Sequence, residues 1–218
     1  LNLSAIISYS KEIVLKIANS LYEEFKIDNL CLSGGVALNC VANGKLLQST
    51  NFKKVWIQPA AGDSGGALGA SLAVWFDKFK NSRFSKNIMQ GSYLGPSYSN
   101  KEIRIILDKN KSKYKKLTNE KLIQTAAEVL ANDKYIGWFQ GRMEFGPRAL
   151  GNRSILANPC SNETQRDLNL KIKFRESFRP FAPAILIEET KNWFKLNCES
   201  PYMLLVSEIN DKIKKNSE

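Results

Sequence analysis

The sequence predicts a mixed α/β fold, and three observations support this prediction. Apolar residues between Lys11 and Phe25 recur with the spacing of one helical face. Two strand–turn–helix units follow, each with a glycine-rich turn, and later apolar strands alternate with more polar helices. Hydrophobic residues make up 43% of the 218-residue chain, which is enough to build packed cores. The chain is therefore expected to be globular.

Two glycine-rich turns occupy equivalent places in the two strand–turn–helix units. In the first unit, a strand at 30–32 leads through Ser33, Gly34 and Gly35 to a helix over 36–47. In the second, "KVWIQP" is the strand, "AAGDSGG" the turn and 67–79 the helix. A helix amino end with free N–H groups binds anions, and glycine lets a phosphate approach the backbone. Neither turn matches a P-loop or a dinucleotide-binding fingerprint, so a purely structural role for the glycines stays equally open.

Asp63 lies in the second turn among residues too small to shield its carboxylate. Such a carboxylate suits a hard cation or the metal ion of a nucleotide. Aspartate is also a preferred N-cap residue, so the alternative is that Asp63 only begins the following helix. The local sequence leaves both roles open.

A polar segment with glycine and proline between about 80 and 99 indicates a domain boundary, which we place near residue 88. The predicted domains are therefore 1–87 and 88–218. The pattern of the second domain predicts, in order, helix 101–108, a short basic strand near Tyr114, helix 119–131, strand 135–139, strand 154–157, a polar helix from Glu163 and strand 202–209.

Basic residues are in excess over the whole chain and most clearly in one segment. The 32 Lys and Arg against 21 Asp and Glu give a net charge of +11, which favours anionic partners. Guanidinium groups on neighbouring loops can surround a polyphosphate with bidentate hydrogen bonds. The alternative is that some basic groups of the segment form structural ion pairs with its acidic groups. Residues 141–179 hold eight basic side chains, Arg142, Arg148, Arg153, Arg166, Lys171, Lys173, Arg175 and Arg179, and four acidic ones, Glu144, Glu163, Asp167 and Glu176.

Cysteine, histidine and apolar runs limit the setting and the chemistry. The four cysteines form no C-x-x-C pair, which favours reduced thiols in the cytoplasm over disulfides. No apolar run approaches the roughly 20 residues of a membrane span. The chain has no histidine, so acid–base or metal chemistry must use other groups, or histidines elsewhere in a longer chain.

Four motifs together carry a family resemblance. In chain order they are "LCLSGGVALNCVANGKLL", "QPAAGDSGGALGAS", "GRMEFGPRALGNRSILANP" and "KIKFRESFRPFAPAIL". In sequence and separation they resemble the O-carbamoyltransferase family of the NodU/CmcH type, over most of the chain from about Leu30 to Leu186. Four such motifs in series are far more specific than either glycine-rich turn alone.

The resemblance implies a fold and an activity. The fold would join the later half of an actin- and sugar-kinase-like (ASKHA) domain over 1–87 to a YrdC-like domain over 88–218. Enzymes of this family use ATP to convert carbamoyl phosphate to carbamoyl adenylate with release of pyrophosphate. They then pass the carbamoyl group to a hydroxyl of a small-molecule acceptor. Such highly charged substrates agree with the excess of arginine in loops.

The resemblance also implies site residues. Nucleotide would meet Ser33, Gly34, Gly35 and Asn39, and Asp63 would ligate a divalent metal ion, with Fe, Mn and Mg as candidates. The adenylate-forming pocket would be lined by six basic side chains, Arg142, Arg148, Arg153, Lys173, Arg175 and Arg179.

Departures from the family pattern predict that the chain is an internal fragment. Family members also hold the metal with a pair of histidines in the earlier half of the kinase-like domain, and this chain has none. Leu1 would lie inside that domain, and the YrdC-like domain would continue beyond Ile209. We therefore expect that the isolated chain does not complete carbamoyl transfer. The acceptor, the metal and the oligomeric state stay open, a homodimer included.

Two other functions stay open. A basic nucleic-acid-binding module would explain the net charge, although Trp56, Phe139 and Trp193 lie in apolar runs typical of a core and not of a base-stacking surface. A sugar-kinase-like phosphotransferase would suit the first third of the chain. Carbamoyl phosphate and a hydroxyl acceptor are the expected partners, and neither nucleic acid nor a membrane is expected.

Overall fold

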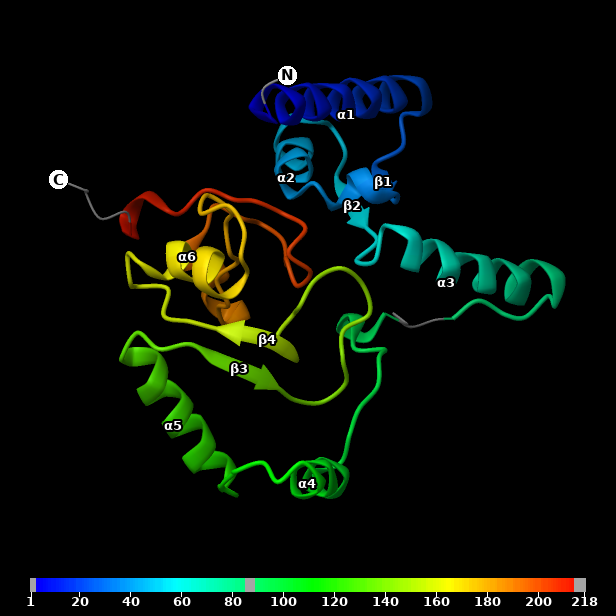
Figure 1. The fold of residues 1–218 in the computed structure, drawn as a ribbon. Coiled ribbons are helices and arrows are strands. Elements are labelled where there is room, and N and C mark those ends of the chain that lie inside the picture. Colours follow the sequence, from blue (N-terminus) through cyan, green and yellow to red (C-terminus); the bar gives the residue numbers. More distant parts are fainter. Residues whose placement is uncertain (1–2, 85–88, 214–218) are drawn as a thin grey trace. The chain divides into compact units, whose positions relative to one another are not determined.

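The structure is a computed structural model that describes residues 3–84 and 89–213 (Figure 1). The predicted mixed α/β class is confirmed, because helices accompany two small sheets. The chain folds into two compact units. Unit 1 consists of Leu1–Ser92, Phe145–Arg148 and Ile185–Glu218, and unit 2 of Tyr93–Glu144 and Ala149–Ala184.

The predicted boundary near residue 88 lies outside the described residues. The compact units are discontinuous in sequence, whereas the predicted domains 1–87 and 88–218 are continuous. Compact units and family domains are different divisions of a chain, so the domain assignment stays a prediction. The ASKHA and YrdC-like details of the fold also stay predictions.

Unit 1 begins with two helices and a parallel pair of strands (Figure 1). These elements are α1 (Leu3–Phe25), β1 (Asn29–Leu32), α2 (Cys40–Ser49) and β2 (Lys54–Ile57). The two strands pair in parallel with Leu30 opposite Val55 and Leu32 opposite Ile57. These four side chains point to one face, which the alternation of a strand requires.

The core of unit 1 lies on that apolar face of the sheet. Leu46 of α2 is fully buried, and Ala18 of α1 and Phe52 are nearly so. Leu30 and Val55 pack against this cluster from the sheet. The ring of Tyr22 meets that of Phe52 edge to face, with 5.3 Å between centroids. Burial of these side chains holds α1 and α2 on the sheet.

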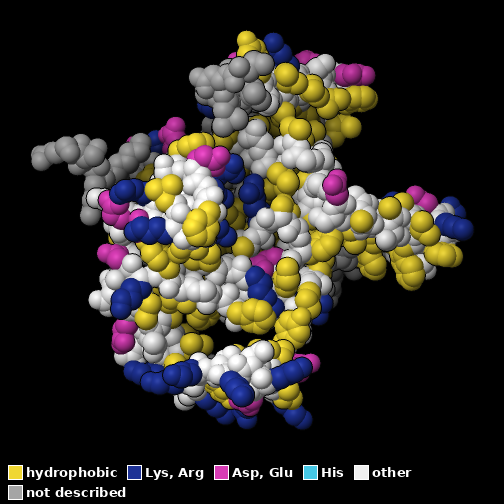
Figure 2. Space-filling view, in the orientation of Figure 1, with side chains coloured by type: hydrophobic (Ala, Val, Ile, Leu, Met, Phe, Trp, Pro, Cys, Tyr) yellow, Lys and Arg dark blue, Asp and Glu magenta, His cyan; other side chains and the backbone are white. Residues whose placement is uncertain are grey.

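The other face of the sheet is bare among the described residues. Cys31 and Trp56 lie opposite each other on it, and both are exposed. The helix α3 (Asp63–Ala73) has no buried residue, and Figure 2 shows apolar side chains on its visible surface. Parallel sheets are normally covered on both faces. The described residues therefore cover only one of them.

Both helices that follow the glycine-rich turns differ from prediction. The first was expected over 36–47, but a 3₁₀ turn (Gly35–Leu38) precedes α2. Asn39 interrupts the helix with ψ 90°, and its Oδ1 accepts the Ala42 N–H as the N-cap of α2. The second helix begins earlier than expected, at Asp63, and ends in a π-helical turn, Val74–Lys78.

The predicted strand at 202–209 is wrong. Met203 has φ 54°, which breaks an extended strand, and the segment forms only an isolated bridge between Phe194 and Ile209. Instead, the C-terminal segment packs on α2. The Asn43 amide donates to the Leu204 carbonyl at 3.0 Å, and Leu204 is buried.

Unit 2 consists of two capped helices, an antiparallel strand pair and a short helix (Figure 1). They are α4 (Asn100–Lys109), α5 (Asn119–Ala131), β3 (Ile136–Phe139), β4 (Arg153–Leu156) and α6 (Thr164–Asp167). Ser99 and Glu102 form a capping box at the start of α4. The predicted strands 135–139 and 154–157 are confirmed to within one residue, and they pair with Phe139 opposite Arg153.

The short basic strand predicted near Tyr114 is wrong. Residues 111–120 are all exposed, so no face of this segment packs against a core as one face of a strand usually does. The Tyr114 hydroxyl donates to Asp108 at 2.9 Å, which ties the segment to the end of α4. No helix in the described part of the chain is long and apolar enough to cross a membrane.

The contact between α2 and the C-terminal segment generates a prediction. A β-carbon on Gly44 would lie 2.5 Å from the Val206 carbonyl oxygen. We expect Gly44→Ala to lower the free energy of unfolding by about 1–3 kcal/mol, the usual cost of overpacking, when measured by urea denaturation. Gly66→Ala is the matched control, because nothing lies within 4 Å of its added β-carbon. Alanine is favoured over glycine in a helix by about 0.5–1 kcal/mol, so the control should match or exceed the wild type. Equal stability of Gly44→Ala and wild type would contradict the packing.

Candidate functional site

The two glycine-rich turns lie at one edge of the β1–β2 sheet. Because the strands run parallel, their carboxyl ends reach the same edge, where ligands of open α/β sheets bind. Ser33 directly follows β1, and Asp63 begins the helix after β2. The Gly34 N–H donates to the Ala61 carbonyl at 2.8 Å, which joins the turns. The structure therefore brings the predicted residues of both turns together.

The glycines of the two turns differ in what surrounds them. Gly34 has φ 95°, which favours glycine, and nothing lies within 4 Å of a β-carbon at Gly34 or Gly35. By contrast, a β-carbon on Gly65 would lie 2.0 Å from the Ala60 carbonyl oxygen. Gly65 therefore serves close packing, while the exposed first turn leaves its backbone accessible to a ligand.

Asn39 has a structural contact of its own. It lies one residue after the 3₁₀ turn that follows Gly34, and its Oδ1 caps α2 by accepting the Ala42 N–H at 3.2 Å. The side-chain oxygen is therefore already engaged in the absence of nucleotide. The predicted contact of Asn39 with nucleotide stays a prediction.

Asp63 is the first residue of α3 and not its N-cap. The N-cap is Gly62, so the alternative that Asp63 caps the helix is wrong. The carboxylate is exposed and has no hydrogen-bond or ion-pair partner in the described part of the chain. It lies in the first helical turn, where the helix dipole favours a negative charge.

The described residues do not by themselves make up a metal site. Within 3–84 and 89–213, no group of three or more Cys, Asp or Glu side chains could hold a metal ion. Asp63 could supply one ligand, whereas hard cations take six or more oxygen ligands in most protein sites. The predicted metal therefore stays a prediction.

Arg148 belongs to unit 1 and lies beside the first turn. Its Nη2 donates to the Leu38 carbonyl at 3.3 Å, at the end of the 3₁₀ turn. Its Nε is buried and has no partner among the described residues, which is uncommon for a buried donor. Gly146, with φ 126°, lets the same segment pass close to Ala60 of the second turn. A guanidinium with an unpaired donor therefore lies next to the glycine-rich turns.

In unit 2, the carboxylate of Glu144 organises the arginine-bearing loop before β4. Glu144 is 7% exposed, and its Oε1 accepts the N–H groups of Leu150 at 2.6 Å, Asn152 at 2.8 Å and Arg153 at 3.3 Å. Burial raises the pKa of Glu144, but these N–H groups together lower the pKa more, to below its ordinary value of 4.5. The carboxylate is therefore charged at neutral pH and binds its own loop.

Arg142 also holds backbone. Its Nε donates to the Tyr93 carbonyl and its Nη2 to the Leu94 carbonyl, both at 3.1 Å. The Arg142 carbonyl in turn accepts the Asn152 amide at 2.7 Å. These contacts tie the loop to the chain entering unit 2. The predicted role of Arg142 in the adenylate-forming pocket stays a prediction.

Arg153 is engaged by its surroundings on several sides. Its Nη1 donates to the Gln140 carbonyl at 2.6 Å, and its Nη2 to the Gly141 carbonyl at 3.2 Å. The guanidinium carbon lies 3.5 Å from the centre of the Phe139 ring on the paired strand. Most donors of Arg153 are therefore used by the protein, and its predicted role at the site stays a prediction.

A second loop carries Lys173, Arg175 and Arg179. Lys173 is exposed. Arg179 forms an exposed ion pair with Glu176 at 2.9 Å. The Nε of Arg175 donates to the Asn169 Oδ1 at 2.7 Å, and no other nitrogen of this guanidinium has a partner among the described residues. Arg175 is thus oriented by a neutral group, and its two Nη groups stay available to a ligand.

Ion pairing was the alternative role for the basic segment, and some of its side chains fulfil it. Most side chains in these pairs are more than half exposed, so each pair contributes at most about 1 kcal/mol to the stability of the fold. The pairs are Arg166–Glu163 at 3.1 Å, Lys171–Asp167 at 2.7 Å and Arg179–Glu176 at 2.9 Å.

The sequence reasoning missed two buried asparagines. Asn43 is 1% exposed and Asn169 is fully buried. Asn43 donates to the Ala37 carbonyl at 2.8 Å and so supports the first turn from α2. The signal in the sequence was that Asn43 is a polar residue at a position where the helical pattern predicts an apolar one.

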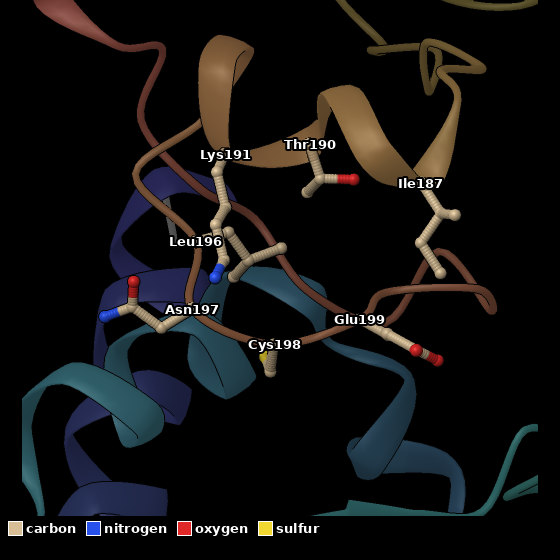
Figure 3. Close-up of a pocket in the computed structure, with 7 residues that line it drawn as sticks. All are labelled: Ile187, Thr190, Lys191, Leu196, Asn197, Cys198 and Glu199. Carbon is tan, nitrogen blue, oxygen red and sulfur yellow. The ribbon is translucent and has the colours of Figure 1, made fainter.

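A small cavity of about 170 Å³ lies in the C-terminal segment of unit 1 (Figure 3). It is smaller than the roughly 300 Å³ at which ligand pockets usually begin. Partial burial raises the pKa of the Cys198 thiol, which disfavours the reactive thiolate. None of the predicted site residues is among its lining residues, which are Ile187, Thr190, Lys191, Leu196, Asn197, Cys198 and Glu199.

Open glycine-rich turns at strand ends and loops rich in arginine define a mixed α/β protein whose candidate sites favour anions. Its family follows from two matches. The family model described as "Carbamoyltransferase N-terminus" matches residues 2–72, and "Carbamoyltransferase C-terminus" matches 127–218. The chain belongs to the carbamoyltransferase family, of the NodU/CmcH type, and the predicted family is confirmed.

Curated relatives agree with this assignment. Uncharacterized protein sll1178 of Synechocystis sp. is 50% identical over 209 residues, which cover 94% of this chain and 34% of the relative. Nodulation protein NolO of Bradyrhizobium diazoefficiens is 41% identical over 186 residues, 84% of this chain and 34% of the relative. The 3'-hydroxymethylcephem-O-carbamoyltransferase of Streptomyces clavuligerus is 31% identical over 183 residues, 84% of this chain and 33% of the relative. The chain spans about a third of the length of these relatives.

The buried carboxylate of Glu144 generates a second prediction. We expect Glu144→Gln to lower the free energy of unfolding by about 1–3 kcal/mol at pH 7, because three N–H groups lose a charged acceptor. The folded-state pKa lies below 4.5, so the contribution of the carboxylate is present above 4.5 and is lost as pH falls through the folded-state pKa. The difference between wild type and variant should therefore close at acid pH.

Denaturation curves between neutral and acid pH measure this difference. Glu163→Gln is the control, since its exposed ion pair with Arg166 contributes at most about 1 kcal/mol. A difference between Glu144→Gln and wild type that stays constant below the folded-state pKa would contradict the proposed contacts of the carboxylate.

Proposed function

We propose that the protein carrying these 218 residues is an ATP-dependent O-carbamoyltransferase that acts on a hydroxyl of a small molecule. The observation that carries the proposal is the pair of family matches, to the N-terminal and C-terminal carbamoyltransferase models in that order along one chain. The Streptomyces relative is named as an O-carbamoyltransferase, which supports the hydroxyl as the acceptor group.

The proposed reaction has two stages. In the first stage, water cleaves carbamoyl phosphate to carbamate and inorganic phosphate, and a carbamate oxygen then attacks the α-phosphorus of ATP while pyrophosphate leaves with the bonding electron pair. The acceptor hydroxyl oxygen then attacks the carbamoyl carbon, and AMP leaves with the bonding electron pair. Negative charge builds on the departing phosphate groups in the first stage, so fixed cationic donors accelerate it.

The open turn of unit 1 suits the nucleotide part of this reaction. The backbone at Gly35 is accessible, and the Nη1 group of Arg148 beside this turn has no partner among the described residues. Backbone N–H groups and a guanidinium are the groups that bind phosphate oxygens. Asp63 at the same edge is proposed to contribute one ligand to a divalent metal ion, and no step above depends on that metal.

Arg175 suits the anionic part of the reaction in unit 2. Its Nε is fixed by a neutral amide, and the two remaining nitrogens form the fork that matches two oxygens of a phosphate. Among the other predicted basic residues of unit 2, Arg142 and Arg153 donate to backbone carbonyls, and Arg179 pairs with the Glu176 carboxylate, which offsets its charge. Lys173 has no bidentate fork. We therefore assign the main anion contact of this loop to Arg175.

The setting of the protein is proposed on the same chemistry. All four cysteines are free, which suits a reducing compartment such as the cytoplasm. ATP and carbamoyl phosphate as substrates fit this location. A homodimer stays an expectation.

Pyrophosphate exchange tests the proposed reaction. Since the relatives are about three times as long, the assay uses a chimera in which residues 1–218 replace the matching segment of the Synechocystis relative. We expect exchange of labelled pyrophosphate into ATP that requires carbamoyl phosphate. Formation of ADP without pyrophosphate would instead indicate a sugar-kinase-like phosphotransferase. Salt-sensitive binding of nucleic acid without exchange would indicate the nucleic-acid-binding alternative.

Arg175 and Arg179 offer a matched pair of substitutions in one loop. Arg175→Lys keeps the charge but loses the bidentate fork, so the exchange rate should fall about ten- to a hundredfold, the value of a charge-assisted contact. Arg179→Lys should change the rate little, because its guanidinium already pairs with exposed Glu176. Melting temperatures of both chimeras control for folding. Equal rates for the two variants would remove Arg175 from the proposed site.

A further inference from the structure

We propose that Asn169 is a positioning residue that fixes the guanidinium of Arg175 for anion binding. The proposal rests on the proposed function in one respect, the use of Arg175 to bind a phosphate-bearing substrate. It adds a residue that no motif of the family resemblance singles out as a ligand. The observation behind it is a fully buried amide whose hydrogen bonds all go to the loop that carries Arg175.

The amide of Asn169 is saturated by this loop. Its Nδ2 donates to the Ser177 carbonyl at 3.1 Å and to the Arg179 carbonyl at 2.8 Å. Its Oδ1 accepts the Nε–H of Arg175 at 2.7 Å. Its backbone carbonyl also accepts the Arg175 backbone N–H at 3.0 Å. One residue therefore fixes Arg175 at both its main chain and its side chain.

An asparagine is required for this set of contacts. Its amide combines two donors with an acceptor in one plane, and the loop presents two carbonyls and one N–H to it. Aspartate would have no donor for the carbonyls, and an apolar residue would leave the Ser177 carbonyl and the Arg175 Nε–H without this partner, whereas the Arg179 carbonyl would keep only the Gln165 amide. Loss of a hydrogen-bond partner is unfavourable for each of these groups, so the position discriminates among side chains.

The contacts orient the guanidinium and leave its outer edge free. The ring of Phe181 lies 5.0 Å from the Arg175 guanidinium carbon and adds a second constraint. With Nε bonded to Asn169, the Nη1 and Nη2 groups have no partner among the described residues. An arginine held in this way binds a phosphate without first losing its side-chain freedom, so binding is stronger than for a mobile arginine.

A double-mutant cycle tests whether Asn169 acts through Arg175. The probe is inorganic pyrophosphate, titrated calorimetrically into the chimera that carries residues 1–218 in the Synechocystis relative. Arg175→Ala should weaken binding about ten- to a hundredfold, the loss of a charge-assisted contact. Asn169→Ala should weaken it roughly three- to tenfold, the factor that immobilising one flexible side chain is worth. In the Arg175→Ala background, Asn169→Ala should have almost no further effect.

Gln165→Ala is the matched control. The Gln165 amide donates to the carbonyls of Phe178 at 3.3 Å and Arg179 at 3.2 Å, so it holds the same loop without a bond to Arg175. Its loss should lower the melting temperature but leave pyrophosphate affinity nearly unchanged. If Asn169 had only a structural role, the two alanine variants would weaken binding in proportion to their loss of stability.

A spectroscopic measurement on the wild-type chain tests the same contact and does not depend on whether a variant folds. The Nε–H of Arg175 should exchange with solvent far more slowly in nitrogen-15 NMR spectra than that of exposed Arg104. Equally fast exchange of the two groups would overturn the proposal. In Asn169→Ala the Arg175 signal should become fast, whereas in Gln165→Ala it should stay slow.

The outcomes separate this proposal from the proposed function. If Arg175→Ala weakens pyrophosphate binding and Asn169→Ala does not, the positioning role is wrong while the proposed function stands. Additive losses in the double-mutant cycle would also overturn the positioning role. If the wild-type chimera does not bind pyrophosphate although the Arg175 Nε–H exchanges slowly, the anion site fails, and the role of Asn169 in anion binding fails with it.

Discussion

Backbone polar groups of irregular segments must find partners once they leave water, and this constraint governs the loops that carry the candidate site residues. These loops have few ladder hydrogen bonds of their own. Buried side chains of Asn43, Glu144 and Asn169 supply the missing partners instead. Each of the three bonds to main-chain groups of at least two loop residues. The loops are therefore ordered largely by buried polar side chains.

The same constraint divides the arginines by function. Arg142 and Arg153 donate to backbone carbonyls and so take part in ordering their loop. Arg148 and Arg175 each keep guanidinium donors that the described residues do not use. Some basic residues of the motifs thus stabilise their loop, whereas others keep donors that can bind a ligand. The difference arises because the folded loop decides which backbone carbonyls lie close enough to accept a hydrogen bond from each guanidinium.

Local sequence patterns were sufficient for features that depend on neighbours in the chain. The strands β3 and β4 follow from short apolar runs, and the open turn at Gly34 follows from its glycines. The predicted strand at 202–209 failed because Met203 adopts a positive φ and the segment packs on α2.

Features that depend on contacts distant in sequence could not be predicted in this way. Asn43 and Leu204 are 161 positions apart, and no local pattern relates them. The role of Asn169 was missed for a similar reason, since its partners lie in a loop with no regular periodicity. Asp63 gave a mixed result, because a one-residue shift of the helix start moved the cap to Gly62 and left the carboxylate free.

An arginine that is fixed before its ligand binds loses its side-chain entropy during folding and not during binding. A mobile arginine loses side-chain entropy on binding, and that loss weakens its contact with the anion. Asn169 moves this loss into folding, where the bonds to Ser177 and Arg179 offset it. A neutral amide is also better suited to this task than a carboxylate, because it orients the guanidinium without neutralising its charge. The guanidinium that the site offers to an anion is therefore fixed in place by a neutral partner, which suits stabilisation of a developing negative charge.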